Sequence, residues 1–181
     1  MTACQTGRMT VILYIGGARS GKSRLAEARV RSLSDTPVYI ATAEARDAEM
    51  AERIARHRGD RGEGWRVIED PMDLVGALAK TTGDVRLVDC LTLWLSNVML
   101  AEKDIDAEMS GLLDSLSSST GDVVLVSNEV GQGIVPDNTL ARAFRDQAGR
   151  LNQAVAAIAD EVVLVTAGLP MTLKAEARHD G

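Results

Sequence analysis

Aromatic residues and cysteine are scarce in this sequence, and each scarcity excludes a class of protein. Only 3% of the 181 residues are aromatic, so a platform of exposed rings that stacks on nucleic-acid bases is not expected. The two cysteines, Cys4 and Cys90, lie far apart and have no CxxC spacing. This pattern is typical of a reduced cytosolic protein without structural disulfides or a zinc site.

Positive charge is also in deficit. The sequence contains 20 Lys and Arg residues against 26 Asp and Glu residues, a net charge of −6, whereas a nucleic-acid-binding domain normally carries a basic stripe. No apolar run approaches the roughly 18 residues that cross a bilayer, and residues 1–8 lack the apolar stretch of a secretory signal. The sequence therefore predicts a cytoplasmic protein that neither spans a membrane nor binds nucleic acid.

Short β-branched runs alternate with longer helical patterns, and this alternation predicts an α/β fold with a mostly parallel sheet and helices on both faces. A single domain is expected at residues 10–168, between a flexible N-terminal tail at 1–9 and a C-terminal tail at 169–181. The expected strands are Val11–Ile15, Val38–Ala41, Arg66–Ile68, Val85–Asp89, Val123–Ser127 and Val162–Thr166. The expected helices are Lys22–Leu33, Glu44–Arg58, Met72–Lys80, Leu91–Ala101, Ile105–Leu116 and Thr139–Ile158.

The first expected strand leads directly into a GxxxxGK[ST] motif that opens a helix, which is the setting of a phosphate-binding P-loop. Glycines let the backbone curl so that consecutive N–H groups face phosphate oxygens, and the helix N-terminus adds a positive dipole end. Lys22 is expected to act on the β- and γ-phosphates and Ser23 to ligate Mg²⁺. A glycine-rich turn that only caps a helix is the alternative. The motif consists of Gly16, Gly17, Ala18, Arg19, Ser20, Gly21, Lys22 and Ser23.

A magnesium–phosphate site also needs a carboxylate, and Asp89 closes a buried apolar run where such a residue is expected. The alternative role for Asp89 is to cap the helix that begins at Leu91. No Asn/Thr-Lys-x-Asp string for reading guanine in a signalling GTPase is present; the nearest string is residues 127–131. The sequence therefore favours a P-loop NTPase-type kinase or transferase over a molecular switch.

One of the two histidines, His57, lies at the expected end of a helix and beside four arginines at positions 53, 56, 58 and 61. An arginine cluster suits a polyanion such as a triphosphate. The helix end favours the charged imidazolium, whereas the arginines favour the neutral, nucleophilic form. From the residues alone, His57 could also be a packed surface side chain on the face of Met50 and Ile54.

Four segments together resemble the bifunctional adenosylcobinamide kinase / adenosylcobinamide-phosphate guanylyltransferase family of cobalamin biosynthesis. The resemblance runs from about Val11 to Thr166, and generic P-loop proteins lack its last segment, Asn-Glu-Val-Gly-x-Gly-Ile-Val-Pro. The segments are residues 16–24, Tyr39 to Ala43, Glu49 to Arg58 with Trp65 and Glu69 downstream, and Asn128 to Pro136 running into Arg142, residues 144–146 and residues 149–153.

This resemblance implies two reactions and a cofactor set of ATP, GTP and Mg²⁺. The hydroxyl of adenosylcobinamide takes the γ-phosphate of ATP or GTP; a histidine, which aligns with His57, then attacks the α-phosphate of GTP. The phosphorylated cobinamide receives the GMP group and becomes adenosylcobinamide-GDP. The family precedent is a homotrimer, so a homo-oligomer is expected here.

The resemblance also implies further nucleotide contacts. Some relatives have Glu where this chain has Asp89, so the carboxylate is kept with a shorter reach, and relatives can have a second histidine at the position of Arg56. Two alternatives to the bifunctional enzyme are a kinase restricted to γ-transfer and a non-catalytic nucleotide-binding subunit. The further contacts are Ala41, Thr42, Ala43, Arg58, Gly59, Asp60, Arg61, Glu69 and Asp89.

Overall fold

The fold of this chain is known from a computed structural model. The structure describes residues 9–45 and 47–175, without the side chains of Glu49, Met50, Arg53, His57, Asp60 and Arg61. This part of the chain forms one seven-stranded sheet in the order β3-β2-β4-β5-β1-β6-β7. All neighbouring strands are parallel except β6 and β7, which pair antiparallel at one edge. The fold class predicted from the sequence is therefore confirmed.

Apart from β7, the strands and helices lie where the sequence predicts them, with bounds that differ by at most four residues. The strands are β1 (Val11–Gly16), β2 (Val38–Ala41), β3 (Arg66–Glu69), β4 (Arg86–Asp89), β5 (Val123–Asn128), β6 (Glu161–Thr166) and β7 (Leu169–Ala175). The helices are α1 (Lys22–Arg31), α2 (Ala48–Arg61), α3 (Leu74–Lys80), α4 (Leu91–Leu100), α5 (Ile105–Ser118) and α6 (Thr139–Ile158).

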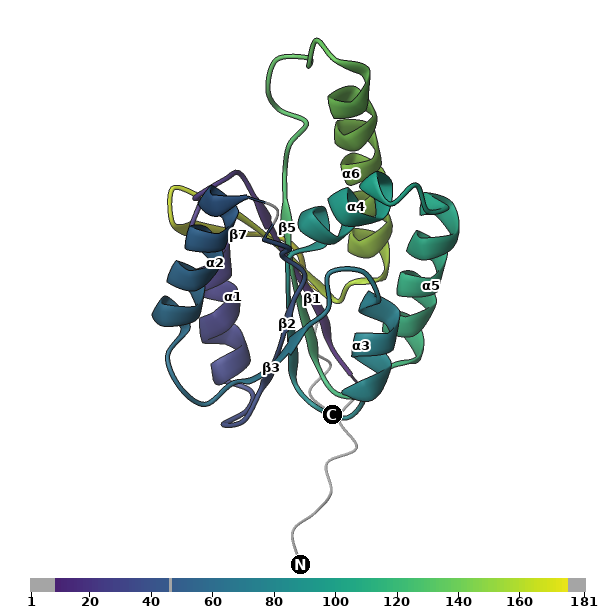
Figure 1. Ribbon diagram of the computed structural model, residues 1–181. Helices are drawn as coiled ribbons and strands as arrows, with labels where there is room; N and C mark the ends of the chain where they lie inside the picture. Colours follow the sequence, from purple (N-terminus) through teal and green to yellow (C-terminus); the bar gives the residue numbers. More distant parts are fainter. Residues whose placement is uncertain (1–8, 46, 176–181) are drawn as a thin grey trace, which may run out of the picture.

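Helices cover both faces of the sheet, as Figure 1 shows: α1 and α2 lie on one side, and α3 to α6 on the other. The interior strand β1 supplies alternate side chains to the two resulting cores. Val11 and Leu13 join the core under α3 to α6, whereas Ile12 and Tyr14 join the core under α1. Because both faces are buried, β1 appears in the sequence as a continuous apolar run.

The apolar helix α4 belongs mostly to the core rather than to the surface. Trp94, Leu95 and Val98 are fully buried, and only Leu100 at its end is half exposed. Among the described residues, no helix has the length and hydrophobicity that a membrane span requires.

The strand β7 corrects the expectation that the chain continues as a tail after residue 168. A tight turn at Ala167 (φ 53°) and Gly168 (φ 80°) returns the chain along β6. Lys174 then donates hydrogen bonds to the carbonyls of Ala156 and Ala157 at the end of α6. The sequence pattern is weak because Pro170 interrupts the strand and most of its side chains are exposed.

Candidate active site

The P-loop lies between β1 and α1 at the carboxyl edge of the sheet. Gly21 adopts φ 93° directly before α1, a conformation that favours glycine. A Cβ atom at Gly16 would lie 2.4 Å from the carbonyl oxygen of Val165, so the loop can approach β6 this closely only without a side chain. Lys22 is buried, and its Nζ donates to the carbonyl of Gly17 at 3.1 Å. The lysine amine therefore lies against the first residues of the loop.

Two further features of the loop concern Ser20. Its hydroxyl is buried and has no hydrogen-bond partner among the described residues. A buried polar atom without a partner costs about 1–3 kcal/mol, so a ligand with oxygen atoms, such as a phosphate, fits this loop. The carbonyl of Ser20 accepts a 2.8 Å hydrogen bond from the amide of Gly168. The β6–β7 turn thus supports the P-loop from one side.

Asp89 lies at the carboxyl end of β4, and β5 separates it from the P-loop strand β1. Its Oδ2 accepts a 2.7 Å hydrogen bond from the hydroxyl of Tyr39. The alternative role as a helix cap is wrong, because Cys90 is the N-cap residue of α4 and makes no side-chain capping bond. No group of three His, Cys, Asp or Glu side chains within the described ranges could hold a metal. A single carboxylate such as Asp89 fits Mg²⁺, which usually takes one or two protein ligands together with phosphate oxygens and water.

Cys90 follows Asp89 but is unsuited to be a nucleophile. The thiol is buried, and burial followed by the negative charge of Asp89 raises its pKa above the ordinary value near 9. The reactive thiolate is therefore disfavoured at neutral pH.

The segment Ala41–Ala43 lies at the end of β2, at the same edge of the sheet. The hydroxyl and the amide of Thr42 form hydrogen bonds within the protein. Its hydroxyl donates to the carbonyl of Cys90 and accepts from the amide of Cys90, both at 2.8 Å. Its own amide donates to the carbonyl of Asp89. The Nδ2 of Asn97 in α4 donates a 2.9 Å hydrogen bond to the carbonyl oxygen of Thr42. The segment is thus fixed between β2, β4 and α4.

Helix α2 carries His57, and it extends to Arg61 rather than ending at Arg58 as expected. The side chains of His57, Asp60 and Arg61 lie outside the described residues. Arg58 forms an ion pair with Glu69 at the carboxyl end of β3, and both side chains are 55% exposed. This pair connects the helix that carries the histidine to the same edge of the sheet that carries the P-loop.

The carboxyl end of β5 holds a polar network that the sequence pattern alone does not predict. Asn128 donates to the hydroxyl of Thr92 at 2.6 Å. Asn152 of α6 donates to the carbonyl of Asn128 at 3.1 Å and accepts from the hydroxyl of Ser127 at 2.6 Å. Asn128 and Asn152 lie in segments that resemble the known family, and this resemblance was their only signal in the sequence.

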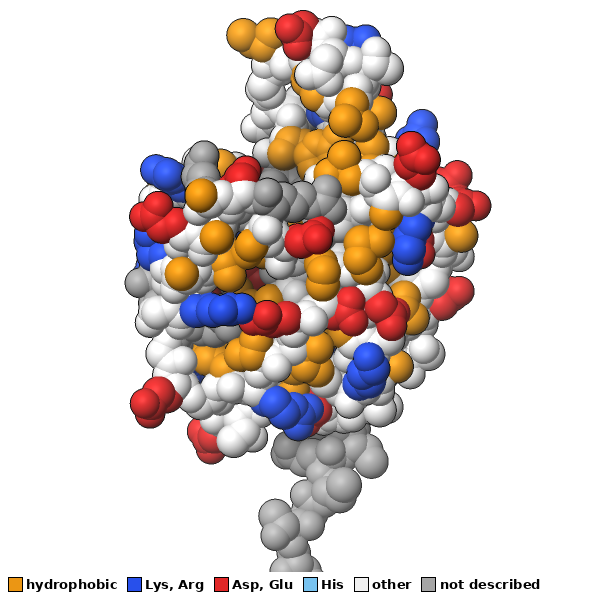
Figure 2. Space-filling view, viewed as in Figure 1, with side chains coloured by type: hydrophobic (Ala, Val, Ile, Leu, Met, Phe, Trp, Pro, Cys, Tyr) orange, Lys and Arg blue, Asp and Glu red, His pale blue; other side chains and the backbone are white. Residues whose placement is uncertain are grey.

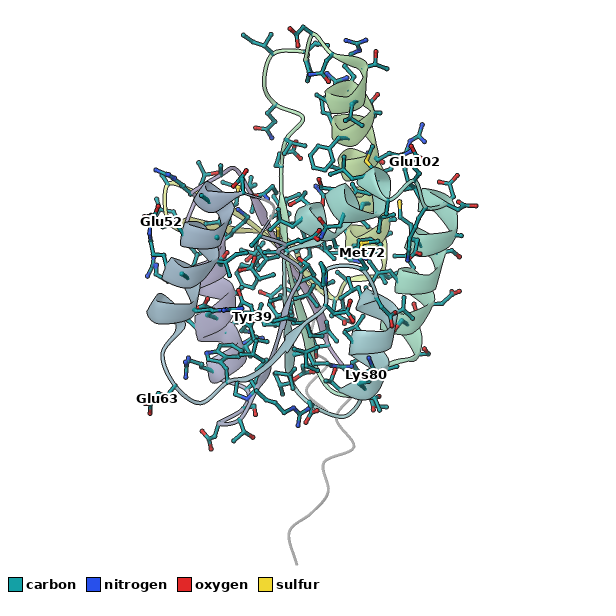
Figure 3. All side chains as sticks on the ribbon, in the orientation of Figure 1. Tyr39, Glu52, Glu63, Met72, Lys80 and Glu102 are labelled. Carbon is teal, nitrogen blue, oxygen red and sulfur yellow. The ribbon has the colours of Figure 1, made fainter. Side chains whose placement is uncertain are left out.

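Tyr39, the hydrogen-bond partner of Asp89, packs against a second aromatic ring. The rings of Tyr39 and Trp65 meet edge to face, with centroids 5.6 Å apart. The guanidinium of Arg31 lies 5.1 Å from the centroid of the Trp65 ring. Tyr39, which is labelled in Figure 3, points from β2 into the layer between the sheet and the helices α1 and α2. Its hydroxyl is therefore held in place by side chains on the face opposite α4.

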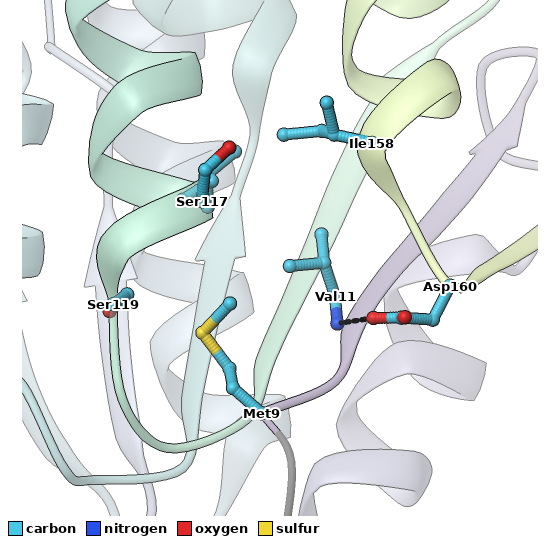
Figure 4. A pocket seen from close by; sticks show the side chains of 7 residues that line it. Met9, Val11, Ser117, Ser119, Ile158 and Asp160 are labelled. Carbon is cyan, nitrogen blue, oxygen red and sulfur yellow. Dashed lines mark hydrogen bonds between the residues drawn. The ribbon is translucent and has the colours of Figure 1, made fainter.

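The surface of the described chain has two further features. A cavity of about 300 Å³ is present at the amino end of β1, lined by Met9, Ser117, Ile158 and Asp160 among others (Figure 4). It lies at the opposite edge of the sheet from the P-loop. The loop between β5 and α6 rises above the body of the molecule (Figures 1 and 2), and it exposes apolar side chains, with Ile134 97% and Val135 62% exposed.

Comparisons with known proteins identify relatives over nearly the whole chain. A family model described as cobinamide kinase / cobinamide phosphate guanyltransferase matches residues 12–173. The bifunctional adenosylcobalamin biosynthesis protein CobP of Pseudomonas aeruginosa is 47% identical over 168 residues, which cover 91% of this chain and 97% of the relative. The corresponding protein CobU of Escherichia coli K12 is 41% identical, with 91% and 99% of the two chains covered.

Solved structures support the fold alone. An ATPase from the type III secretion system of pathogenic bacteria aligns with a TM-score of 0.54 and 15% identity. The alignment covers 90% of this chain but 56% of the ATPase, so this chain spans little more than half of that protein. A protein of Pyrococcus horikoshii aligns with a TM-score of 0.58 and 10% identity over 93% of this chain and 88% of its own.

Proposed function

This chain belongs to the cobinamide kinase / cobinamide phosphate guanyltransferase family of bifunctional enzymes, and we propose that it carries out both reactions on adenosylcobinamide. The hydroxyl of adenosylcobinamide receives the γ-phosphate of ATP or GTP. The phosphorylated product then receives GMP from GTP, which gives adenosylcobinamide-GDP and releases pyrophosphate. One observation carries the proposal: the P-loop and the Asp89 carboxylate lie at the same edge of the sheet. The chain that holds them is 47% identical to a bifunctional cobalamin biosynthesis protein.

In the kinase reaction, the P-loop binds the triphosphate through its backbone N–H groups. Lys22 stabilises the charge that develops on the transferred phosphoryl group. The Ser23 hydroxyl and the Asp89 carboxylate would hold Mg²⁺, which neutralises phosphate charge when it is bound. Both side chains belong to elements that meet at the carboxyl edge of the sheet.

In the guanylyl transfer, neutral His57 attacks the α-phosphorus of GTP. The bond from that phosphorus to pyrophosphate breaks, and its electron pair leaves with the pyrophosphate. The phosphate of the substrate then displaces His57 from the GMP group. Arginine charge compensates the departing pyrophosphate, and Arg58, which is half exposed and paired with Glu69, is suited to this role. A nucleophilic histidine needs a neutral imidazole, and this form is available near pH 7.

The remaining nucleotide contacts are proposed at Ala41, Ala43, Gly59, Asp60, Arg61 and Glu69. Because the amide and hydroxyl of Thr42 already bond within the protein, we assign Thr42 to holding its segment in place. The reactions use ATP and GTP, and we expect the enzyme to act in the cytoplasm where these nucleotides are made. A homotrimer is also part of the proposal, supported by exposed apolar residues such as Leu169, Met171 and Leu173 of β7.

The proposal is tested by incubating the purified protein with adenosylcobinamide, Mg²⁺ and GTP and separating the corrinoids by chromatography. We expect adenosylcobinamide-phosphate to appear first and adenosylcobinamide-GDP to follow. Accumulation of the phosphate alone would support the kinase restricted to γ-transfer. Tight nucleotide binding without any corrinoid product would support the non-catalytic subunit. Light scattering should give about three times the 19.3 kDa mass of one chain.

A further inference from the structure

The two proposed reactions differ in whether the nucleophile has a proton to lose. The attacking hydroxyl of adenosylcobinamide must give up its proton during phosphoryl transfer. The attacking nitrogen of neutral imidazole and the attacking oxygen of a phosphate carry no proton near pH 7, since the second pKa of a phosphate monoester is about 6. If the proposed function holds, the enzyme therefore needs a general base for the kinase reaction and none for the guanylyl transfer.

Three strands carry a carboxylate at or just after their carboxyl ends within the described part of the chain. Glu69, the last residue of β3, forms an ion pair with Arg58 and is exposed. Asp89, at the end of β4, accepts a hydrogen bond from the hydroxyl of Tyr39. In the proposed function this carboxylate binds Mg²⁺. Glu129 follows β5 and has no cationic partner in the described structure. Glu129 belongs to the segment most characteristic of the family, yet the proposed reactions give it no role.

Glu129 lies directly beside the P-loop. Asn128 pairs with Gly16 in the register of β5 and β1, and the amide of Glu129 donates to the carbonyl of Gly16 at 3.0 Å. Glu129 is therefore level with Gly17, whose carbonyl accepts the Lys22 amine at 3.1 Å. Since that amine serves the β- and γ-phosphates in P-loop enzymes, Glu129 borders the place where a γ-phosphate is attacked.

One oxygen of the Glu129 carboxylate is fixed and the other is available. Oε1 accepts a hydrogen bond from the amide of Gly131 at 2.5 Å, whereas Oε2 accepts none from any described residue. The backbone at this point is held by Asn152 through the carbonyl of Asn128, and Asn128 is held in turn by Thr92. Such restraint on both sides keeps a catalytic group in position.

We propose that Glu129 is the general base of the kinase reaction. As the substrate oxygen forms its bond to the γ-phosphorus, the bond from that phosphorus to the β–γ bridging oxygen breaks. The electron pair of the broken bond stays on the nucleoside diphosphate. The hydroxyl proton passes to Oε2 of Glu129 and from there to water. Glu129 takes no part in the formation or transfer of the GMP group.

The test separates the two reactions in a Glu129→Gln variant. Glutamine keeps an oxygen that can accept from Gly131 but cannot take up a proton. We expect the turnover of adenosylcobinamide to its phosphate to fall by about 10²- to 10⁴-fold, the usual contribution of a positioned base. The conversion of supplied adenosylcobinamide-phosphate to adenosylcobinamide-GDP should keep the wild-type rate, and so should GMP labelling from GTP. Asp137→Asn, an exposed position in the same loop, serves as the matched control for both reactions.

Each result of this experiment decides one question. If the wild type does not phosphorylate adenosylcobinamide, the proposed function fails. If the wild type is active and Glu129→Gln loses less than about tenfold in that reaction, the assignment of the base is overturned. Equal losses in both reactions would also overturn it, because they indicate a structural role. Glu129→Ala is measured in the same two assays, so that a folding defect of the glutamine variant does not leave the question open.

Discussion

The hydrogen bond from Tyr39 to Asp89 should stabilise the fold, and a substitution at Tyr39 measures by how much. Its hydroxyl donates to Asp89 Oδ2 at 2.7 Å from a side chain that is 3% exposed. Tyr39→Phe removes this donor and keeps the ring that packs on Trp65. Because a hydrogen bond to a carboxylate contributes about 1.5–3 kcal/mol, the free energy of unfolding should fall by this amount. For a chain of this length the corresponding loss of Tm is roughly 3–12 °C.

The assay is chemical denaturation followed by tryptophan fluorescence, in a double-mutant cycle with Asp89→Ala. In the Asp89→Ala background, Tyr39→Phe should cost almost nothing, because the acceptor has already been removed. Tyr14→Phe is the control, since Tyr14 is also buried but its hydroxyl makes no hydrogen bond within the described residues. If the losses from the changes at positions 39 and 89 add within about 0.5 kcal/mol, the hydrogen bond between the two side chains does not stabilise the fold. A loss from Tyr14→Phe equal to that from Tyr39→Phe would contradict the prediction as well.

Three other predictions concern buried residues of the fold. Arg86→Leu should lower the free energy of unfolding by about 3–5 kcal/mol in denaturation experiments, because the fully buried guanidinium bonds to the Leu78, Thr120 and Gly121 carbonyls and to Ser119; a loss below 1 kcal/mol would contradict this. Gly16→Ala should reduce Tm and weaken nucleotide binding in calorimetry at least tenfold, since its Cβ would clash with the carbonyl of Val165, whereas Gly17→Ala, with no atom within 4 Å, should keep Tm. In a Cys4→Ser background, Cys90 should stay unreactive toward a thiol reagent at pH 8 until the protein is unfolded, because burial raises its pKa. The contribution of the neutral thiol to stability should be complete below the ordinary thiol pKa near 9 and should be lost as the pH rises further. Rapid labelling of the native protein would contradict the burial of this thiol.

The sequence allowed the parallel strands and the P-loop to be predicted because their signals are local. A buried parallel strand such as β1 is a continuous apolar run, and the glycine–lysine motif follows it directly. The edge strand β7 gave no such signal, since it is amphipathic, interrupted by Pro170 and held by contacts distant in sequence. The support that the β6–β7 turn gives to Ser20 could not be predicted for the same reason.

For the polar side chains around the site, the residues were visible in the sequence but their partners were not. Asp89 was predicted because it ends an apolar run, but its partner Tyr39 lies 50 residues away and only pairing of β2 with β4 brings them together. Asn152 supports the end of β5 from the middle of α6, where an asparagine could equally face water. In each case the residue type was visible in the sequence, whereas its contact depended on the register of the sheet and the packing of a helix.

Covalent labelling by GTP tests whether His57 carries the GMP group. The protein is incubated with Mg²⁺ and GTP labelled at the α-phosphate, and the product is examined by denaturing electrophoresis and intact mass. We expect an acid-labile, alkali-stable GMP adduct on the wild type and on the control Asp137→Asn, and none on a His57→Ala variant that still binds GTP. An unlabelled wild type that is folded and binds GTP, or an adduct that persists in His57→Ala, would contradict the proposed guanylyl-histidine mechanism.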